Sequence, residues 1–465
     1  MYQVPQHISE DKIFIVKKSK LDGRLDPKMA LYNKSVQHAI YPMIKLKSLL
    51  LSKPQYGANE AGIIRECREQ PRYIRITDID KNGLISTNEL GATVTNVKEK
   101  YILNKNDIVI ARSGATVGKA YIHKQQPYTC IYAGYLIRFI VDSKKILPDY
   151  LFTYTQLNPY KEWVSAIQRP SAQPNINAEE YQSLEIPLPN LSKQREIVEH
   201  INAAYAQKQL KEVEAQQLLD SIDGYLLKEL GITIPEIKDD IDSRMFIVHK
   251  KDLIGQYMPS LYKDAISLYS AIYDNIPLSH LAYINPNTKL PQLKKEMQIS
   301  FVPMESVNEI YAEIDDYKNC VIENSKGFTR FQEGDLLWAK ITPCMENGKS
   351  AIAKDLTNGY GCGSTEFHVV RPKNGDLLIE YIQSLLHMKL VRQTAKLYFG
   401  GSAGQQRVAT DFLESFNVPF PSKAKQQEIV DYIADTRTRA KALQEEGKAI
   451  LEDAKRKVEL MIMGK

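Results

Sequence analysis

The chain has 465 residues, more than one hydrophobic core usually serves, so its length predicts at least two domains. Apolar residues make up 43% and charged residues 25% of the sequence, which is the composition of an ordinary soluble globular protein. The net charge of +5 is a modest basic excess that permits a polyanionic partner without requiring one.

The cysteines and the hydropathy pattern exclude several other classes of protein. The five cysteines are scattered, odd in number and never spaced as Cys-x-x-Cys, which argues against a disulfide framework or a zinc site. No run approaches the roughly 18 apolar residues of a membrane span, and the N-terminus lacks an apolar signal core. We therefore expect no membrane segment and a cytoplasmic location.

The first part of the chain is predicted to be a globular domain built mostly of short strands. Residues 107–111 and 134–141 are apolar or β-branched runs, and Gly, Asn, Asp and Pro turns separate such runs. A helix is expected at residues 148–157.

A long helix is predicted to follow, from about Ser192 to Leu230. The Pro-containing segment 186–189 forces extended backbone just before it, no proline interrupts it, and Gly231 is a suitable C-terminal cap. Such a helix would have about 39 residues and a length of roughly 58 Å.

The second half of the chain repeats the first. Residues 418–421 and 426–430 repeat the Pro-containing segment and helix entry, and Ile429 lies 232 residues after Ile197. Strands are expected at 299–304, 335–339 and 366–370, and a helix at 376–387. Shorter matches support the duplication: 14–16 with 246–248, Gly23 with Gly255, Pro27 with Pro259, and 171–172 with 402–403.

We therefore predict an α+β protein with two tandem globular domains, each followed by a long helix, and an internal repeat of about 232 residues. The predicted boundaries are 1–190 and 232–422 for the globular domains, and 191–231 and 423–465 for the helices.

Both helices carry a narrow apolar stripe at the a and d spacing of a coiled coil. One interpretation is that each stripe packs on its own domain; the other is that the helices pack on each other, with alanines and Gly447 permitting close approach. The candidates for contacts between the helices or with a docking partner are Ile197, Ile201, Leu218, Ile222, Ile429, Ile433, Leu443 and Ile450.

Catalytic motifs are not recognisable. Residues 113–120 and 343–350 resemble a P-loop, but each lacks an essential residue and is followed by a predicted strand instead of a helix. Residues 158–160 and Pro343-Cys344 lack the surroundings of a methyltransferase loop, and the histidines and carboxylates form no motif of a metal site, triad or nuclease. The pattern favours a binding protein.

The loops after the buried strands offer groups suited to DNA. Arginine and lysine can bind guanine, amides can pair with adenine, and glycine lets the backbone approach a phosphate. Each loop alone could be a plain turn, but the loops recur in both halves. The candidates are Arg112, Ser113, Thr116, Lys119, Arg169, Gln173 and Asn175 in the first half, and Lys340, Thr342, Lys349, Gln405, Gln406 and Arg407 in the second.

These motifs together resemble the specificity subunit of type I restriction-modification systems. The resemblance covers essentially the whole chain and follows the order of elements in that family. The segments that carry it are 186–189 with 194–198, 418–421 with 426–430, 107–119, 334–349 and 363–369. The last segment adds Ser364 to the candidate DNA-binding residues.

The resemblance implies a non-catalytic subunit that binds double-stranded DNA. Each globular domain would be a target recognition domain for one half of a split sequence, and the helices would form an antiparallel coiled coil that spaces the domains and docks partners. Adenine N6-methyltransferase subunits, two of them, and restriction/translocase subunits would be the partners. They would bring S-adenosylmethionine, ATP and Mg, so no cofactor or metal is expected in this chain.

Three other interpretations stay open. A stand-alone, repressor-like DNA-binding protein would bind its site tightly without partners. An enzyme with an unrecognised site would turn over DNA when purified alone. An assembly scaffold would show no salt-dependent affinity for DNA.

Overall fold

The computed structural model describes residues 27–80, 82–85, 90–168, 174–234, 268–289, 294–401 and 405–464. The chain divides into two compact units. Unit 1 comprises Met1–Lys211 and Glu445–Lys465, and unit 2 comprises Glu212–Gln444. Each unit contains a globular part and one section of each long helix.

Unit 1 mixes short strands with short helices ahead of the first long helix. Its helices are α1 (Pro27–Ser35), α2 (Pro148–Thr155), α3 (Asn158–Ile167), α4 (Ala178–Gln182) and the first part of α5 (Leu191–Glu229). Its 3-10 helices are η2 (Val36–His38), η3 (Leu46–Leu49), η4 (Ile76–Asp78) and η5 (Glu99–Tyr101). Its strands are β1 (Met43–Lys45), β2 (Gln55–Tyr56), β3 (Ile63–Ile64), β4 (Arg72–Ile74), β5 (Ala92–Thr93), β6 (Ile108–Ala111), β7 (Ala120–Ile122), β8 (Cys130–Tyr132), β9 (Leu136–Phe139) and β10 (Glu185–Pro187).

Unit 2 has the same plan. Its helices are α7 (Leu278–Leu281), α8 (Ile379–His387), α9 (Lys389–Lys396), α10 (Thr410–Ser415) and the first part of α11 (Lys423–Met463). Its 3-10 helices are η8 (Met304–Ser306), η9 (Ile322–Ser325) and η10 (Thr357–Gly359). Its strands are β11 (Asn275–Pro277), β12 (Ala282–Ile284), β13 (Gln298–Val302), β14 (Lys318–Val321), β15 (Thr329–Gln332), β16 (Leu336–Ala339), β17 (Ser350–Ile352), β18 (Tyr360–Gly363), β19 (Phe367–Pro372), β20 (Phe399–Gly400), β21 (Arg407–Val408) and β22 (Asn417–Pro419).

The sheets confirm the internal repeat and the α+β fold. In unit 1 the order β2-β9-β6-β7 forms an inner sheet, and in unit 2 the order β12-β19-β16-β17 forms its counterpart. The outer sheets are β3-β5-β4-β8 and β14-β13-β18-β15, and each contains one parallel pair, β4 with β8 or β13 with β18. The outer sheets differ at their edges, because β3 extends one and β15 the other.

The central strand of each inner sheet is buried on both faces. In β6, Ile108 and Ile110 belong to one hydrophobic cluster, while Val109 and Ala111 belong to another. In β16, Leu336 and Trp338 belong to one cluster and Leu337 to another. Side chains on a strand point to opposite faces in turn, so a continuous apolar run is what such a doubly covered strand requires.

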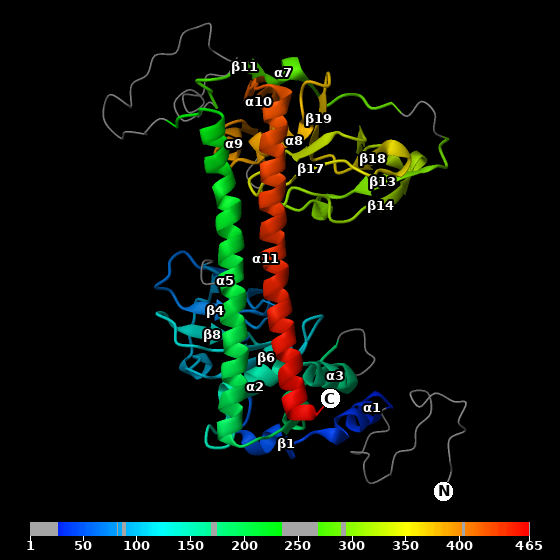
Figure 1. The fold of residues 1–465 in the computed structure, drawn as a ribbon. Coiled ribbons are helices and arrows are strands. Elements are labelled where there is room, and N and C mark those ends of the chain that lie inside the picture. The colour runs from blue at the N-terminus through cyan, green and yellow to red at the C-terminus, as the bar shows by residue number, and fades with distance from the viewer. Residues whose placement is uncertain are drawn as a thin grey trace, which may run out of the picture. The chain divides into compact units, whose positions relative to one another are not determined.

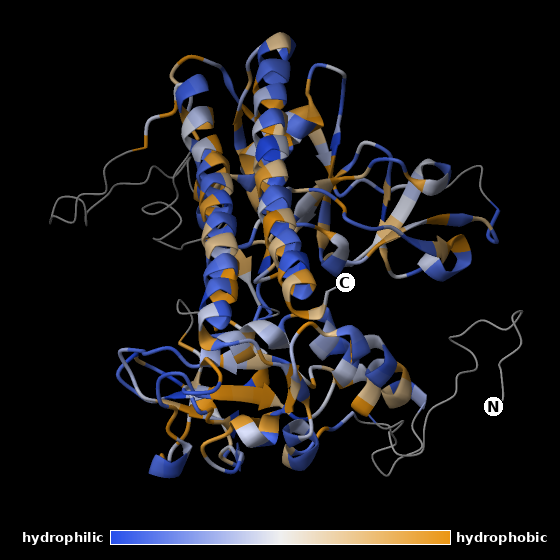
Figure 2. Ribbon diagram, turned by 60° about the horizontal axis from the view of Figure 1, so that its bottom comes forward, coloured by the Kyte–Doolittle hydropathy of each residue, from blue (hydrophilic) through white to orange (hydrophobic). Residues whose placement is uncertain are grey.

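Both long helices begin just after a Pro-containing strand, as predicted, and they run antiparallel within each unit (Figure 1). In unit 1, Lys211 of α5 pairs with Glu446 of α11 at 3.0 Å. In unit 2, the rings of Tyr225 and Tyr432 stack with their centroids 3.8 Å apart. Figure 2 shows apolar residues on both helices among many hydrophilic ones.

The two interpretations of the apolar stripe are compatible. In unit 1, Ile197 and Ile201 share one hydrophobic cluster both with residues of the globular part and with Leu451 and Val458 of α11. In unit 2, Ile222 shares a cluster with Ile429 and Ile433 and with the globular part. The stripe therefore packs on its own domain and on the other helix.

Some details of the predicted elements were wrong. Beyond Gly447 the predicted stripe steps through Ile450, Ala454, Lys457 and Met461. The buried positions there are Leu451, Ala454, Val458, Ile462 and Met463, so the stripe is right at Ala454 and is displaced by one residue at the other three positions. The helix predicted at 148–157 ends at Thr155, and a second helix, α3, follows it with Pro159 in its first turn. The matches at 14–16, 246–248, 171–172 and 402–403, and those at Gly23, Gly255 and Pro259, lie outside the described residues.

Candidate nucleic-acid interface

One edge of each inner sheet is built by the same set of backbone hydrogen bonds. In unit 1, the amide of Arg112 donates to Tyr135 O (2.9 Å), and Arg112 O accepts the amide of Ile176 (2.8 Å). In unit 2, the amide of Lys340 donates to Glu366 O (2.9 Å), and Lys340 O accepts the amide of Val408 (2.9 Å). We call these the first edge and the second edge.

The same frame extends by one further bond on each edge. Gly114 donates its amide to Pro174 O at 3.1 Å, and Thr342 donates to Gln406 O at 3.0 Å. The loops near Asn175 and Arg407, distant in sequence from the strands, are thereby held against the ends of β6 and β16. This brings together most of the predicted DNA-binding residues of each half.

The first edge presents an arginine supported by neutral groups. The Arg112 guanidinium lies over the ring of Tyr56, 4.8 Å from its centroid, and its Nε lies 3.5 Å from Asn175 Oδ1. Tyr135, whose carbonyl accepts the Arg112 amide, is 48% exposed. A guanidinium held on an aromatic face keeps further donors that can bind guanine or phosphate. Ser113 and Thr116 are half-buried in the same loop.

The second edge presents an arginine that is already paired. Arg407 donates from Nε and Nη2 to the two carboxylate oxygens of Glu366, each at 2.8 Å. These hydrogen bonds lower the pKa of Glu366 and raise that of Arg407. Within the part of the chain that the structure describes, Lys340 Nζ has no hydrogen bond or ion pair, so its charge is available beside the Glu366–Arg407 pair.

The remaining predicted residues of the second edge have varied surroundings. Thr342 donates its hydroxyl to the carboxylate of Glu346, which also pairs with Lys396. Ser364 Oγ accepts the amide of Glu366 at 3.2 Å. Gln405 is exposed and Gln406 is half-buried.

The two lysines of the P-loop-like segments have structural contacts. Lys119 Nζ donates to Ile79 O at 2.5 Å, and Lys349 Nζ donates to Met304 O (3.1 Å) and Val307 O (3.0 Å). Each lysine thus fastens a strand hairpin to a neighbouring 3-10 turn. The DNA-binding role of both lysines stays a prediction, and these contacts compete with it.

The glycine before each of these lysines is also explained by the fold. Gly118 and Gly348 have φ of +87° and +90°, and a Cβ on Gly118 would lie 2.8 Å from Val164 Cγ1. Glycine adopts this conformation without steric cost. Strands β7 and β17 follow these turns, so neither segment leads into the helix that a P-loop needs.

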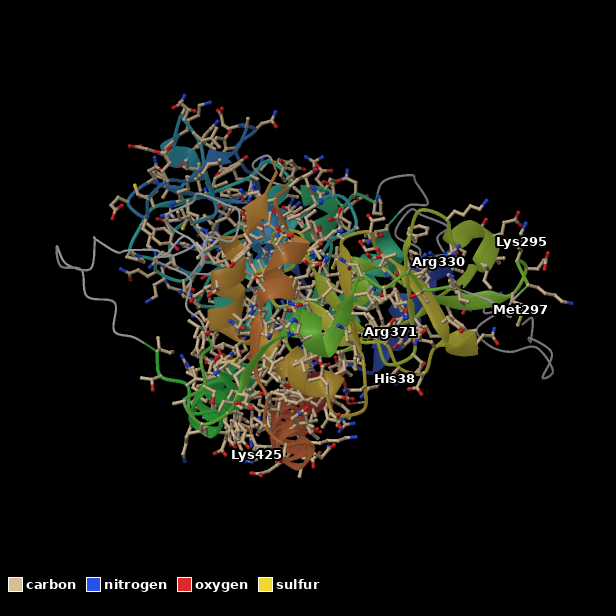
Figure 3. The ribbon with its side chains drawn as sticks, turned by 90° about the horizontal axis from the view of Figure 1, so that it is seen from above. His38, Lys295, Met297, Arg330, Arg371 and Lys425 are labelled. Carbon is tan, nitrogen blue, oxygen red and sulfur yellow. The ribbon has the colours of Figure 1, made fainter. Side chains whose placement is uncertain are left out.

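A cleft of about 410 Å³ lies in unit 2 and was not predicted from the sequence. Asn285, Asn287, Lys326, Phe328 and Arg330 contribute to its lining (Figure 3 labels Arg330). These residues come from two segments some 40 positions apart, so no local pattern could have identified the cleft.

A hydrogen-bonded chain links this cleft to the second edge. Asn285 Nδ2 lies 3.0 Å from His368 Nδ1, and His368 Nε2 lies 2.9 Å from Val408 O, next to Arg407. Burial lowers the pKa of His368, so its ring is neutral near pH 7 and can donate one hydrogen bond and accept another.

Arg169 and Gln173 lie outside the described residues, so their DNA-binding role stays a prediction. The candidate docking residues are covered within their own units. Ile197, Ile201, Ile222, Ile429 and Ile433 are buried, and the three others are half-buried: Leu218, Leu443 and Ile450. A partner that docks on these helices would therefore contact mainly their exposed faces.

No group of three or more His, Cys, Asp or Glu residues in the described part of the chain is arranged to hold a metal ion. None of the helices in this part of the chain combines the length and the apolar character needed to cross a membrane.

A family model described as type I restriction modification DNA specificity domain matches the chain twice, at residues 64–221 and 276–452. The chain belongs to this family. The two matches correspond to the two halves of the repeat, and each includes one of the two edges.

Individual relatives match only part of the chain. The specificity subunit of the type I restriction enzyme EcoEI from Escherichia coli is 40% identical over 156 residues, and that of EcoAI from Escherichia coli is 38% identical over 160 residues. Each match spans 33% of this chain and 26% of the relative. The chain thus matches about a quarter of the length of these relatives.

A solved structure supports the fold. A chain described under "Structural basis underlying complex assembly and conformational transition of the type I R-M system" is similar with a TM-score of 0.50 and 13% sequence identity. The similarity covers 90% of this chain and 95% of the other.

Proposed function

We propose that this chain is the DNA-recognition subunit of a type I restriction-modification complex and that each unit binds one half of a bipartite target. The observation that carries the proposal is the recurrence of one backbone frame at two edges that present different side chains. Identical frames with different hydrogen-bonding groups suit the recognition of two different half-sites. The family membership and the two matched regions support this function over a repressor or a scaffold.

The chemistry of the edges fits base recognition. Arg112 and Lys340 occupy equivalent places and can bind guanine O6 and N7, while Asn175, Gln405 and Gln406 carry amides that can pair with adenine. Lys326 and Asn287 in the cleft extend the second edge with groups that can bind the DNA backbone.

The long helices would provide both spacing and docking. The 39 residues of α5 correspond to about 58 Å, more than the roughly 34–36 Å of one turn of B-DNA. The proposed division is a recognition domain at 1–190, a spacer helix at 191–231, a second recognition domain at 232–422 and a second helix at 423–465.

The chemistry would belong to partner subunits. Two adenine N6-methyltransferase subunits would dock on the helices, bring S-adenosylmethionine and flip the target adenine out of the stack. Restriction/translocase subunits would supply ATP hydrolysis and cleavage. This chain would be a non-catalytic cytoplasmic subunit without a cofactor of its own.

The first test is co-expression with the methyltransferase encoded beside it, followed by long-read detection of methylated adenine in the host DNA. A split motif with N6-methyladenine on both strands is the expected result. A stable complex that produces no methylation would contradict the proposal and favour the repressor or the scaffold.

Exchange of residues 1–190 for the first domain of another family member is expected to change one half-site only. The reason is that the first edge lies entirely within these residues. The methylated motif of the hybrid, determined by the same sequencing, checks this. A change in both half-sites would show that the two units do not recognise DNA independently.

A further inference from the structure

The start of each long helix is joined to its globular domain by one buried glutamine. Gln194 of α5 and Gln426 of α11 are both 0% exposed. Gln194 Oε1 accepts the amide of Leu147 at 2.7 Å, and its Nε2 donates to Lys145 O (3.1 Å) and Pro189 O (2.9 Å). One side chain thus connects three backbone segments: the helix entry, the Pro-containing segment and the start of α2.

The second half repeats this arrangement atom for atom. Gln426 Oε1 accepts the amide of Leu378 at 2.9 Å, and its Nε2 donates to Asp376 O (3.1 Å) and Pro421 O (3.0 Å). The carboxamide therefore uses both donors and its acceptor in each half.

A buried tyrosine adds a second connection at each joint. Tyr150 of α2 donates its hydroxyl to Pro187 O at 2.6 Å, and Tyr381 of α8 donates to Pro419 O at 2.7 Å. We call the glutamine, the tyrosine and the backbone atoms that they bind the helix joint of each unit.

Every hydrogen bond of the two joints that we have described ends on a backbone atom of the globular domain. Such a joint does not depend on the side chains that the domain uses for DNA. Domains with different recognition residues can therefore be held on their helices in the same orientation.

The length of the helix explains why this orientation matters. Over the 39 residues of α5, about 58 Å, a tilt of about 3.4° at the start moves the far end sideways by about 3.4 Å, the rise of one base pair. A loose joint would therefore let the recognition domain shift, relative to the far end of its helix, by about the rise of one base pair.

We infer that Gln194 and Gln426 are positioning residues that fix the gap length between the two half-sites. They act through the orientation of each recognition domain on its helix and do not contact DNA. This inference rests on the proposed function and goes beyond it, because it assigns the gap to the joints as well as to helix length.

The test uses the complete chain in complex with its methyltransferase subunits and a DNA library. The library keeps both half-sites and varies the gap by one or two base pairs in each direction. The variant is Gln194→Glu, which is isosteric, keeps an acceptor for Leu147 and replaces the donors to Lys145 O and Pro189 O with a carboxylate oxygen. The matched control is Gln125→Glu, an exposed glutamine of the same unit.

We expect Gln194→Glu to move a several-fold larger share of methylation to neighbouring gap lengths, with both half-sites unchanged, and Gln125→Glu to keep the native gap. An equal loss of methylation at all gaps, or an unchanged gap profile in a folded variant, would overturn the inference. Should Gln194→Glu fail to fold, Tyr150→Phe is the alternative variant, because it removes only the hydroxyl that binds Pro187 O. The distribution of methylation over gap lengths in Tyr150→Phe then tests the inference in the same way.

A measurement on the chain alone separates this inference from the proposed function. Spin labels at Lys144→Cys and Gln207→Cys, both exposed and in unit 1, report the orientation of α5 on its domain when the exposed Cys67 is replaced by serine. A broader or shifted distance distribution in Gln194→Glu supports the joint even if wild-type protein fails to direct methylation. An unchanged distribution contradicts it.

Discussion

The first and second edges share a backbone frame but differ in whether their arginine is paired with a carboxylate. At the first edge, Arg112 rests on Tyr56 and lies near an amide oxygen, so its positive charge stays uncompensated by these neighbours. At the second edge, the bidentate contact with Glu366 neutralises Arg407. The frame is therefore held by backbone atoms, so the side chains at the two edges can differ without disturbing it.

The two halves also differ in the buried ion pair beneath each inner sheet. In unit 2, Arg371 binds both carboxylate oxygens of Asp335 at 2.7 Å. In unit 1, the equivalent Arg138 reaches Asp107 through one contact at 3.5 Å. Burial raises the pKa of Asp107 despite this arginine, so the pair in unit 1 is the weaker one.

The largest expected effect follows from this difference. Arg371→Met leaves the fully buried Asp335 without its charge partner, which should cost about 3–5 kcal/mol of unfolding free energy. Arg138→Met should cost less, about 1–3 kcal/mol, because the ion pair that it breaks is longer and Asp107 takes up a proton more readily. Chemical denaturation measures both costs.

Amide hydrogen exchange assigns the effect to a unit. Faster exchange should appear in β16 for Arg371→Met and in β6 for Arg138→Met. Equal costs for the two variants would mean that the closer geometry in unit 2 does not stabilise it.

The two units also differ at a buried histidine. His123 in unit 1 donates its amide to Asp107 O, and Ala353 makes the same bond to Asp335 O in unit 2. The His123 side chain is 4% exposed, and burial lowers its pKa to about 4. Unit 2 has no titratable group at this position.

Acid should therefore weaken unit 1 at this position. Between pH 6.5 and about 4 the unfolded chain binds a proton at His123 that the folded chain does not, so stability falls as pH falls, by about 1.4 kcal/mol per pH unit at most. His123→Gln should flatten this dependence, and His38→Gln, at an exposed position, should not. The measurement is the denaturation midpoint of the wild type and of both variants at pH 7 and at pH 5. An equal loss of stability between the two pH values in all three proteins would exclude this role of His123.

Local sequence signals were sufficient to predict the helix entries and the repeat. The Pro-containing segments, the long stretches without proline and the 232-residue spacing predicted the helix entries and the repeat, because each signal lies within a few neighbouring residues. The antiparallel helices came from the family resemblance. Beyond Gly447 the seam is displaced by one residue except at Ala454, because packing on the globular part of unit 1 favours Leu451 and Val458.

The site was predictable only in part. The loops at Arg112 and Lys340 stood out as recurring polar turns, but the charge state of the second edge depends on Glu366, which is 41 residues from Arg407. Gln194 has the appearance of an ordinary polar helix residue in the sequence. Only the structure shows that its carboxamide is buried and satisfied by backbone atoms from distant segments.

The smallest expected effect tests the Glu366–Arg407 pair, which has no counterpart among the described contacts of the first edge. Glu366→Gln removes the carboxylate that neutralises Arg407, so we expect a several-fold higher DNA affinity and a salt dependence steeper by about one counterion. The pair is partly exposed, with Arg407 at 41%, so its loss should change stability by no more than about 1 kcal/mol. Fluorescence anisotropy at several salt concentrations measures the affinity.

The matched variant Lys326→Gln removes a positive charge from the cleft of unit 2. If DNA lies along the contacts from Arg407 through His368 to Asn285, Lys326→Gln should change the affinity in the opposite direction from Glu366→Gln. Binding should be weaker, and its salt dependence should be shallower by about one counterion. A changed slope in Glu366→Gln alone would confine DNA to the edge. Changes in neither would mean that the equivalent frames do not face DNA in the same way, and that the first edge carries most of the electrostatic contact.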